Sequence, residues 1–213
     1  MKSVCELVSI SKRYAQHVVL DKMNLAVSEG EMVAITGKSG SGKTTVLNIM
    51  GLLERPDSGI VRLFGEPSPR IGSAKATKLL RTRLSYLFQN CALIDDDTVD
   101  YNLEIPLIYV KGTRREKQTW KMAALEKVGL NISLKQRIYE LSGGEQQRVA
   151  IARILLRPCD LILADEPTGS LDAGNRSEVM RILRELNGAG KTVIVVTHDQ
   201  YVAEACDRRI GLP

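Results

Sequence analysis

The sequence predicts an α/β fold built around a mostly parallel β-sheet. Two apolar runs, Leu161 to Ala164 and Thr192 to Thr197, have the length and composition of strands that are buried on both faces. A third run, Glu31 to Thr36, leads directly into a glycine-rich loop and a helix expected from Lys43. Strands that alternate with helices in this way are typical of parallel sheets.

An antiparallel β region is expected at the N-terminal end. Residues 4–27 are rich in β-forming side chains and partly alternate, which places Met23, Leu25 and Val27 on one face. A further strand is expected at Gly59 to Phe64, before a loop rich in proline and glycine. This region therefore adds a smaller sheet to the parallel one.

The middle of the chain differs in composition from the rest. Between Lys75 and Arg137 helix formers and charges dominate, interrupted by Pro106 and by two glycines. We expect a mainly helical subdomain of residues 75–137, inserted into a single domain (1–213) whose core is residues 1–74 and 138–213. The second part of the core is expected to hold a helix at Glu145 to Leu156, a helix from about Asp172, a short helix and a last strand at Arg209 to Leu212.

Composition excludes several classes of protein. The chain has 213 residues, 44% hydrophobic residues and a formal net charge of +5, as in an ordinary globular protein. The basic residues are dispersed, which favours an ordinary surface over a nucleic-acid partner. Cysteines lack metal-ligand spacing, and we expect them to be reduced in a cytoplasmic protein. No apolar run reaches the roughly 18 to 20 residues of a membrane span, so work at a membrane would require another chain to cross it.

Residues 37–44 (GKSGSGKT) fit the pattern GxxxxGK followed by Ser or Thr, between a predicted strand and a predicted helix. Glycines let successive N–H groups point at one anion, and the helix N-terminus adds its positive dipole end. Lys43 can then reach the β- and γ-phosphates of a nucleotide, and the Thr44 hydroxyl can bind Mg²⁺. An empty glycine-rich turn is the alternative, which the strand–loop–helix context disfavours. The residues expected to contact the nucleotide here are Gly37, Ser39, Gly40, Ser41, Gly42, Lys43, Thr44 and Thr45.

Two acids, Asp165 and Glu166, end the apolar strand that begins at Leu161. Parallel sheets bind ligands at the carboxyl ends of their strands, where both acids emerge. Asp165 suits Mg²⁺, which prefers carboxylate and water ligands. Glu166 is expected to point towards the γ-phosphate and to polarise the attacking water. A solvated turn is the alternative for the acids alone, but the phosphate loop argues against it.

Leu141 to Gln146 (LSGGEQ) decides the family. Ser142 is a good helix N-cap, and Gly143 and Gly144 expose N–H groups ahead of Glu145, which makes a second anion site. The stretch resembles the LSGGQ signature of ABC ATPases, and the resemblance extends over nearly the whole chain. It implies an ABC ATPase fold with a P-loop NTPase core, and it implies that Ser142, Gly143, Gly144 and Glu145 contact nucleotide.

The same resemblance assigns roles to isolated residues. Tyr14 looks like the aromatic residue that stacks on adenine, although an ordinary strand tyrosine is the alternative. Gln89 resembles the glutamine that joins Mg²⁺ and the attacking water to the helical lobe. Asp172, in Ser170-Leu171-Asp172, resembles the loop that crosses a dimer interface. His198 resembles the switch histidine that contacts the γ-phosphate.

The resemblance also implies cofactors and partners. In this family two subunits pack head-to-tail around two Mg-ATP, so we expect a homodimer, or a heterodimer with a similar ATPase. The expected partner is an integral-membrane permease subunit on a separate polypeptide, which places the protein on the cytoplasmic face of the cell membrane. Phe88-Gln89-Asn90 and Ile105 to Tyr109 are similar to the branch that exports macrolides and bacteriocins and releases lipoproteins.

Two other functions stay open. One is an ABC ATPase that transmits force through a membrane partner to cell-division or cell-wall enzymes without moving a solute. The other is an ABC ATPase that acts on DNA or in translation, which is less favoured because neither a long coiled-coil insertion nor a second such domain is present. Cargo is not encoded in this sequence, since the membrane partner selects it.

Overall fold

The computed structural model describes residues 2–169 and 171–212 of the chain. Within them lies a five-stranded sheet with the order β6-β7-β8-β3-β9, in which every neighbouring pair is parallel. The predicted parallel α/β fold is confirmed. The strands of this main sheet are β3 (Met32–Thr36), β6 (Leu84–Leu87), β7 (Leu161–Asp165), β8 (Thr192–Val196) and β9 (Arg208–Gly211).

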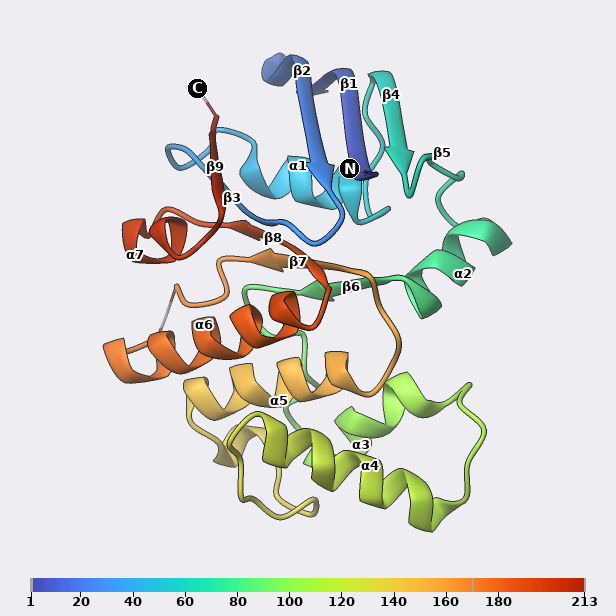
Figure 1. The fold of residues 1–213 in the computed structure, drawn as a ribbon, viewed down its shortest axis with the longest axis vertical. Coiled ribbons are helices and arrows are strands. Elements are labelled where there is room, and N and C mark those ends of the chain that lie inside the picture. The colour runs from blue at the N-terminus through green and yellow to red at the C-terminus, as the bar shows by residue number, and fades with distance from the viewer. Residues whose placement is uncertain (1, 170, 213) are drawn as a thin grey trace.

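A second, antiparallel sheet has the order β2-β1-β4-β5. Its strands are β1 (Ser3–Tyr14), β2 (His17–Ser28), β4 (Ser58–Leu63) and β5 (Glu66–Pro67). In β2, Leu25 and Val27 are buried and Met23 is partly buried, which confirms the predicted inward face. In Figure 1 this sheet lies above the main sheet, with α1 (Lys43–Met50) between the two.

Helices cover the other face of the main sheet. There α5 (Gly143–Leu155) and α6 (Ala173–Gly188) run below the sheet in Figure 1, and α7 (Gln200–Glu204) packs beside β3. Ser142 caps α5 and Asp172 caps α6, so each helix begins where its capping side chain accepts a backbone N–H. The expected helix starts at Glu145 and Asp172 were therefore accurate to within about two residues.

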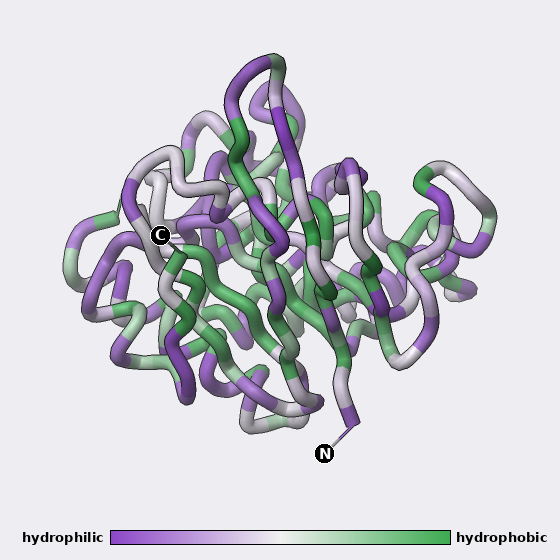
Figure 2. The backbone as a smooth tube through the Cα atoms, turned by 90° about the horizontal axis from the view of Figure 1, so that it is seen from above, coloured by the Kyte–Doolittle hydropathy of each residue, from purple (hydrophilic) through white to green (hydrophobic). Residues whose placement is uncertain are grey.

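The buried strands serve two hydrophobic cores at once. In β7, Leu161 and Leu163 pack into the core that holds α1 and the antiparallel sheet, whereas Ile162 and Ala164 pack into the core that holds α5 and α6. Side chains of a strand point alternately to its two faces, so each strand contributes to both layers. Figure 2 shows the consequence as hydrophobic central strands surrounded by hydrophilic loops.

The segment predicted as a helical insert, residues 75–137, needs a correction. Leu84–Leu87 within it forms β6, which pairs with β7 in the main sheet. Helices are nonetheless the main regular structure of the segment: α2 (Ala74–Thr82) before β6, and α3 (Val99–Glu104), the 3₁₀ turn η1 (Ile105–Leu107) and α4 (Arg114–Lys127) after it. A second 3₁₀ turn, η2 (Ile138–Glu140), lies just beyond it. The name lobe is used below for residues 93–140. Across the described residues, no helix is long and apolar enough to cross a membrane.

Candidate nucleotide-binding site

The predicted phosphate-binding and acidic residues meet at one edge of the main sheet. Because β3, β6, β7 and β8 are parallel, the segments that follow them emerge side by side at their carboxyl ends. The glycine-rich loop follows β3, Gln89 follows β6, Asp165 ends β7 with Glu166 next to it, and His198 follows β8. Side chains separated by more than 150 positions thus share one site.

The loop of residues 37–44 has the backbone that a phosphate cradle requires. Gly42 has a φ of 88°, and a Cβ there would lie 2.7 Å from a methyl of Val19 in β2. A Cβ on Gly37 would lie 2.5 Å from the Ser41 hydroxyl. Ser39 and Gly40 are exposed at the tip of the loop, and Thr45 is buried in the first turn of α1. The left-handed backbone and the close contact with β2 therefore exclude a larger residue at Gly42.

Lys43 is buried, with 8% of its surface exposed, and its ammonium is held inside the loop. Its Nζ donates to the carbonyl oxygens of Gly37 at 2.9 Å and Lys38 at 2.8 Å. The charge therefore stays next to the helix N-terminus and to the loop N–H groups. This arrangement suits an anion with several oxygens.

Two of the three residues predicted to bind Mg²⁺, Thr44 and Asp165, lie together. The Thr44 hydroxyl donates to Oδ1 of Asp165 at 3.2 Å. Burial raises the pKa of Asp165, against the opposing effects of the Thr44 hydrogen bond and the Lys43 charge. A hydroxyl and a carboxylate at this distance form the oxygen donor set that Mg²⁺ prefers, so these residues fit the ion. Gln89, exposed beyond the adjacent strand, is at the same edge.

Glu166 is held in place by three contacts with the end of β8. Its Oε1 lies 2.7 Å from Nδ1 of His198, and its Oε2 accepts from the Thr197 hydroxyl at 3.3 Å. Its N–H donates to the Val196 carbonyl at 2.9 Å. The residue has a φ of 44°, a left-handed conformation that is uncommon for a side chain of this kind. The left-handed backbone and the fixed carboxylate together are consistent with the role predicted for Glu166.

The segment Leu141 to Gln146 forms the tight start of α5. The Ser142 side chain accepts from the Glu145 N–H, and Oε2 of Glu145 accepts from the Ser142 N–H at 2.9 Å and from its hydroxyl at 2.7 Å. These hydrogen bonds from Ser142 lower the pKa of Glu145. Glu145 thus completes a capping box, while Ser142 and Gly143 remain exposed.

Asn175 packs directly against Gly144, a contact that sequence reasoning missed. A Cβ on Gly144 would lie 2.3 Å from the Asn175 side chain, so glycine is required there. Asn175 Nδ2 donates to Asp172 at 2.8 Å, and its Oδ1 accepts from Arg148 at 2.7 Å. Asp172, expected to bind nucleotide, caps α6 in this structure, and Ser170 lies outside the described residues. The only signal for Asn175 in the sequence was its place three residues after the helix N-cap Asp172.

The glycine-rich loop and the start of α5 lie on opposite faces of the main sheet. Side chains of α1 belong to one hydrophobic core and those of α5 to the other. Figure 1 shows the loop ahead of α1 above the sheet and the first turn of α5 below it. One chain therefore presents its two predicted anion-binding elements on separate faces of the sheet.

Tyr14 ends β1 close to the glycine-rich loop and is 46% exposed. Its hydroxyl bonds to the carboxylate of Glu54. Burial and this hydrogen bond raise the pKa of Tyr14, against a smaller opposing effect of the Thr45 hydroxyl in α1. The structure thus places the predicted adenine-stacking ring beside the first turn of α1.

Comparison with known proteins decides the family. Residues 20–169 match the sequence profile of the family described as ABC transporter. The chain belongs to this family. It is 46% identical over 194 residues to the Macrolide export ATP-binding/permease protein MacB of Acinetobacter baylyi, covering 91% of the chain and 29% of that protein. It is 41% identical over 218 residues to the Probable syringafactin export ATP-binding/permease protein SyfD of Pseudomonas syringae pv. syringae, covering 99% and 33%.

Solved structures agree with this assignment. The chain matches the dimeric structure of a post-hydrolysis state of an ATP-binding cassette bound to ADP and Pi with a TM-score of 0.90 at 37% identity. That match covers 98% of this chain and 94% of the other. The predicted ABC ATPase fold, the ATPase class and the resemblance to the macrolide-exporter branch are confirmed. The chain spans a third or less of the length of the curated relatives named above.

Proposed function

We propose that this ATP-binding cassette is the motor of an export transporter, driving a membrane-spanning permease from the cytoplasmic face of the cell membrane. The motor is proposed to be a head-to-tail dimer, and the observation that carries this arrangement is the placement of the glycine-rich loop and the Ser142 segment on opposite faces of one sheet. A single nucleotide bound to one chain does not reach both. Two copies arranged head-to-tail bring each phosphate loop to the Ser142 segment of the other copy, with ATP between them.

Each residue of the site has a task in this arrangement. The loop N–H groups and Lys43 bind the phosphates, and Tyr14 stacks on adenine. Thr44, Asp165 and Gln89 hold Mg²⁺, which when bound neutralises charge on the phosphate oxygens. Glu166 accepts a proton from the attacking water, and His198 keeps its carboxylate in position through the 2.7 Å contact.

The Ser142 segment supplies the test of the dimer. Replacing Ser142 with arginine puts a long cation where the partner's γ-phosphate is expected to lie. We expect ATP binding by the monomer to stay within about twofold of wild type and hydrolysis to fall at least about tenfold, because transition-state contacts are lost. Nucleotide affinity by calorimetry and steady-state phosphate release measure the two effects. Ser133→Arg adds the same side chain to an exposed lobe loop as a control; wild-type turnover of Ser142→Arg would contradict the head-to-tail dimer.

A groove between the core and the lobe is the proposed contact with the permease. It encloses about 590 Å³ and is lined mainly by apolar side chains, among them Leu53, Phe88 and Ile105. Three arginines (Arg81, Arg153 and Arg157) line it, and no acidic side chain does among the described lining residues. An apolar segment of a permease that carries a carboxylate complements this lining.

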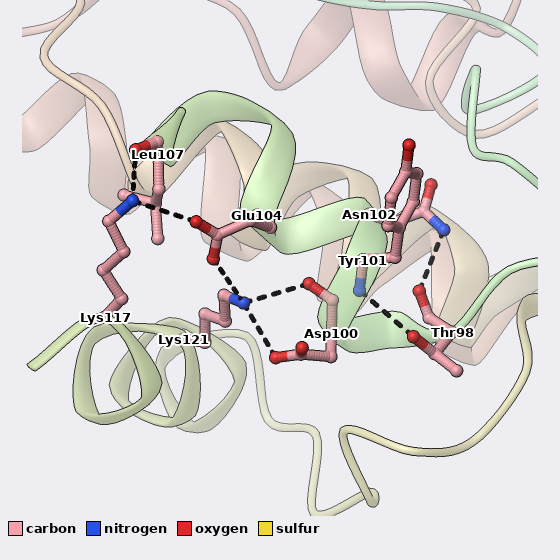
Figure 3. Close-up of polar contacts among 8 residues, drawn as sticks. All are labelled: Thr98, Asp100, Tyr101, Asn102, Glu104, Leu107, Lys117 and Lys121. Carbon is pink, nitrogen blue, oxygen red and sulfur yellow. Dashed lines mark hydrogen bonds and ion pairs between the residues drawn. The ribbon is translucent and has the colours of Figure 1, made fainter. Parts of the chain in front are cut away.

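A network of ionic contacts in the lobe fixes one wall of this groove (Figure 3). Lys121 is only 4% exposed and lies 2.7 Å from both Asp100 and Glu104. Lys117 donates to Glu104 at 2.9 Å and to the Leu107 carbonyl at 2.7 Å. Because α4 thereby holds α3 and η1, the exposed residues Ile105, Ile108 and Tyr109 are presented on a fixed support.

Tyr109, which lies on this wall, tests the groove. It is 71% exposed, and the Arg81 guanidinium stacks on its ring at 3.8 Å from the centroid. We expect Tyr109→Ala to reduce recovery of a membrane protein from detergent-solubilised membranes about tenfold, because exposed aromatic residues dominate interface energetics. Tyr139→Ala, 61% exposed and outside the groove, is the matched control. Equal recovery with both variants would argue against the groove as the docking site.

The permease is expected to determine which cargo is transported. The names of the relatives include macrolide and syringafactin export, so we propose export of a peptide, bacteriocin, antibiotic or lipoprotein. Force transmission to cell-wall or cell-division enzymes uses the same motor geometry and is the second candidate. Identification of the co-purified membrane protein distinguishes the two.

A further inference from the structure

A turn of residues 54–57 contacts the end of strand β1, although the turn and the strand end are about 40 positions apart in the sequence. The Glu54 carboxylate accepts from the Tyr14 hydroxyl, and Asp57 Oδ2 accepts from the Arg13 N–H at 2.8 Å. The turn begins shortly after α1 ends at Met50. Helix α1 starts at Lys43, and the turn that contacts Tyr14 follows the end of this helix within a few residues.

Lys12 connects these groups into a cluster. Its Nζ donates to the Arg55 carbonyl at 2.8 Å and lies 3.1 Å from Glu54 and 3.4 Å from Asp57. The Lys12 and Glu54 side chains are only 14% and 20% exposed, so water screens the pair less than it screens a fully exposed one. Burial opposes the charge of Lys12, but the two carboxylates outweigh it and raise the pKa of Lys12.

The cluster leaves part of Tyr14 accessible to a ligand. The Lys12 ammonium lies 5.4 Å from the ring centroid, which places it over a ring face. The residue is nevertheless 46% exposed. Its hydroxyl cannot turn away without giving up the hydrogen bond to Glu54. A tyrosine tied at its hydroxyl and covered on one side stacks with a smaller loss of side-chain entropy than a mobile one.

We propose that Glu54 and Lys12 are positioning residues for the nucleotide base: they hold the Tyr14 ring in its stacking orientation and so set the base-dependent part of nucleotide affinity. This inference rests on the proposed stacking of Tyr14 on adenine. The cluster touches the base only through Tyr14. Its removal is therefore expected to weaken binding of nucleotides but not binding of their phosphates alone.

Calorimetry with ADP and with inorganic pyrophosphate, in the presence of Mg²⁺, separates these contributions. Tyr14→Ala is expected to weaken ADP binding about tenfold, as the loss of an aromatic stack on a base does. Glu54→Ala is expected to weaken ADP binding about three- to fivefold, and Glu54→Gln less, because its amide oxygen still accepts from the Tyr14 hydroxyl. Pyrophosphate affinity should stay unchanged in all three variants, and Glu66→Ala, exposed on β5, is the control.

A double variant tests whether Glu54 acts through Tyr14. Tyr14→Ala combined with Glu54→Ala should bind ADP as Tyr14→Ala alone does, because the second change has no ring left to position. If Tyr14→Ala weakens ADP and Glu54→Ala does not, the positioning role is wrong and the stacking role stands. If Glu54→Ala weakens ADP and pyrophosphate equally, Glu54 supports the loop and the inference is overturned. An unchanged ADP affinity in Tyr14→Ala overturns the stacking proposal itself.

Discussion

Replacing Glu166 with glutamine is expected to lower ATP turnover by at least about 100-fold while ATP binding is retained, since loss of a general base typically removes two or more decades of rate. Glutamine keeps the shape of the side chain and an oxygen that can accept from Thr197. It lacks the basic carboxylate that removes a proton from water. ATP should therefore remain bound between two copies, and size-exclusion chromatography with ATP should show a stable dimer.

Glu126→Gln is the matched control for this variant, because Glu126 is exposed on α4 and lies away from the sheet edge. Glu126→Gln should hydrolyse ATP at the wild-type rate and should not form a stable dimer when ATP is added. An elution profile of Glu166→Gln that stays monomeric in ATP would contradict the head-to-tail dimer, and turnover near wild type would show that another group activates the water.

Replacing Lys43 with alanine should abolish nucleotide binding at ordinary concentrations, a loss of at least about 100-fold in affinity. The ammonium is held within the loop by two carbonyl oxygens, so its charge sits where the phosphates are expected. Charge-assisted hydrogen bonds to phosphate contribute roughly 1.5 to 3 kcal/mol each, and about 1.4 kcal/mol corresponds to tenfold in affinity. Isothermal titration calorimetry with ADP measures the loss directly.

The control for Lys43→Ala must separate lost binding from a lost fold. Lys75→Ala removes the same charge from an exposed position in α2 and should bind ADP normally. Circular dichroism should report the same helix content for both variants, because α1 keeps its apolar packing through Val46 and Leu47. Unchanged ADP affinity in a folded Lys43→Ala protein would contradict the proposal that Lys43 and its loop bind the nucleotide phosphates.

The sequence predicts the edge of the sheet better than it predicts the lobe. Long apolar strands such as β7 and β8 can be recognised from the sequence by themselves. Asp165, Glu166 and His198 stand at or just after the ends of these strands, so the parallel topology places them at the same edge of the sheet. β6 was missed because Leu84–Leu87 is short and stands between helix-forming segments. Four residues are too few to show a strand-like hydrophobic pattern. Its position explains why Gln89 lies at the same edge as Asp165.

Contacts between distant segments were the part of the site that sequence could not supply. The bond between Tyr14 and Glu54, and the packing of Asn175 on Gly144, join residues from different elements without any local pattern. The left-handed backbone of Glu166 is likewise a product of tertiary contacts, because glutamate has no intrinsic preference for that conformation. Motifs indicate which residues take part, whereas only the fold shows what holds them.

The alternation of side chains in the main sheet has a mechanical consequence. Leu163 faces the layer that carries the phosphate loop, and Ala164, its neighbour, faces the layer that carries the Ser142 segment. A substitution that loosens either layer therefore disturbs a strand on which the other depends. The two elements proposed to form one composite ATP site are therefore supported by a single cooperatively unfolding unit. Weakening the core under the phosphate loop is expected to destabilise the support of the Ser142 segment as well, and the reverse holds too.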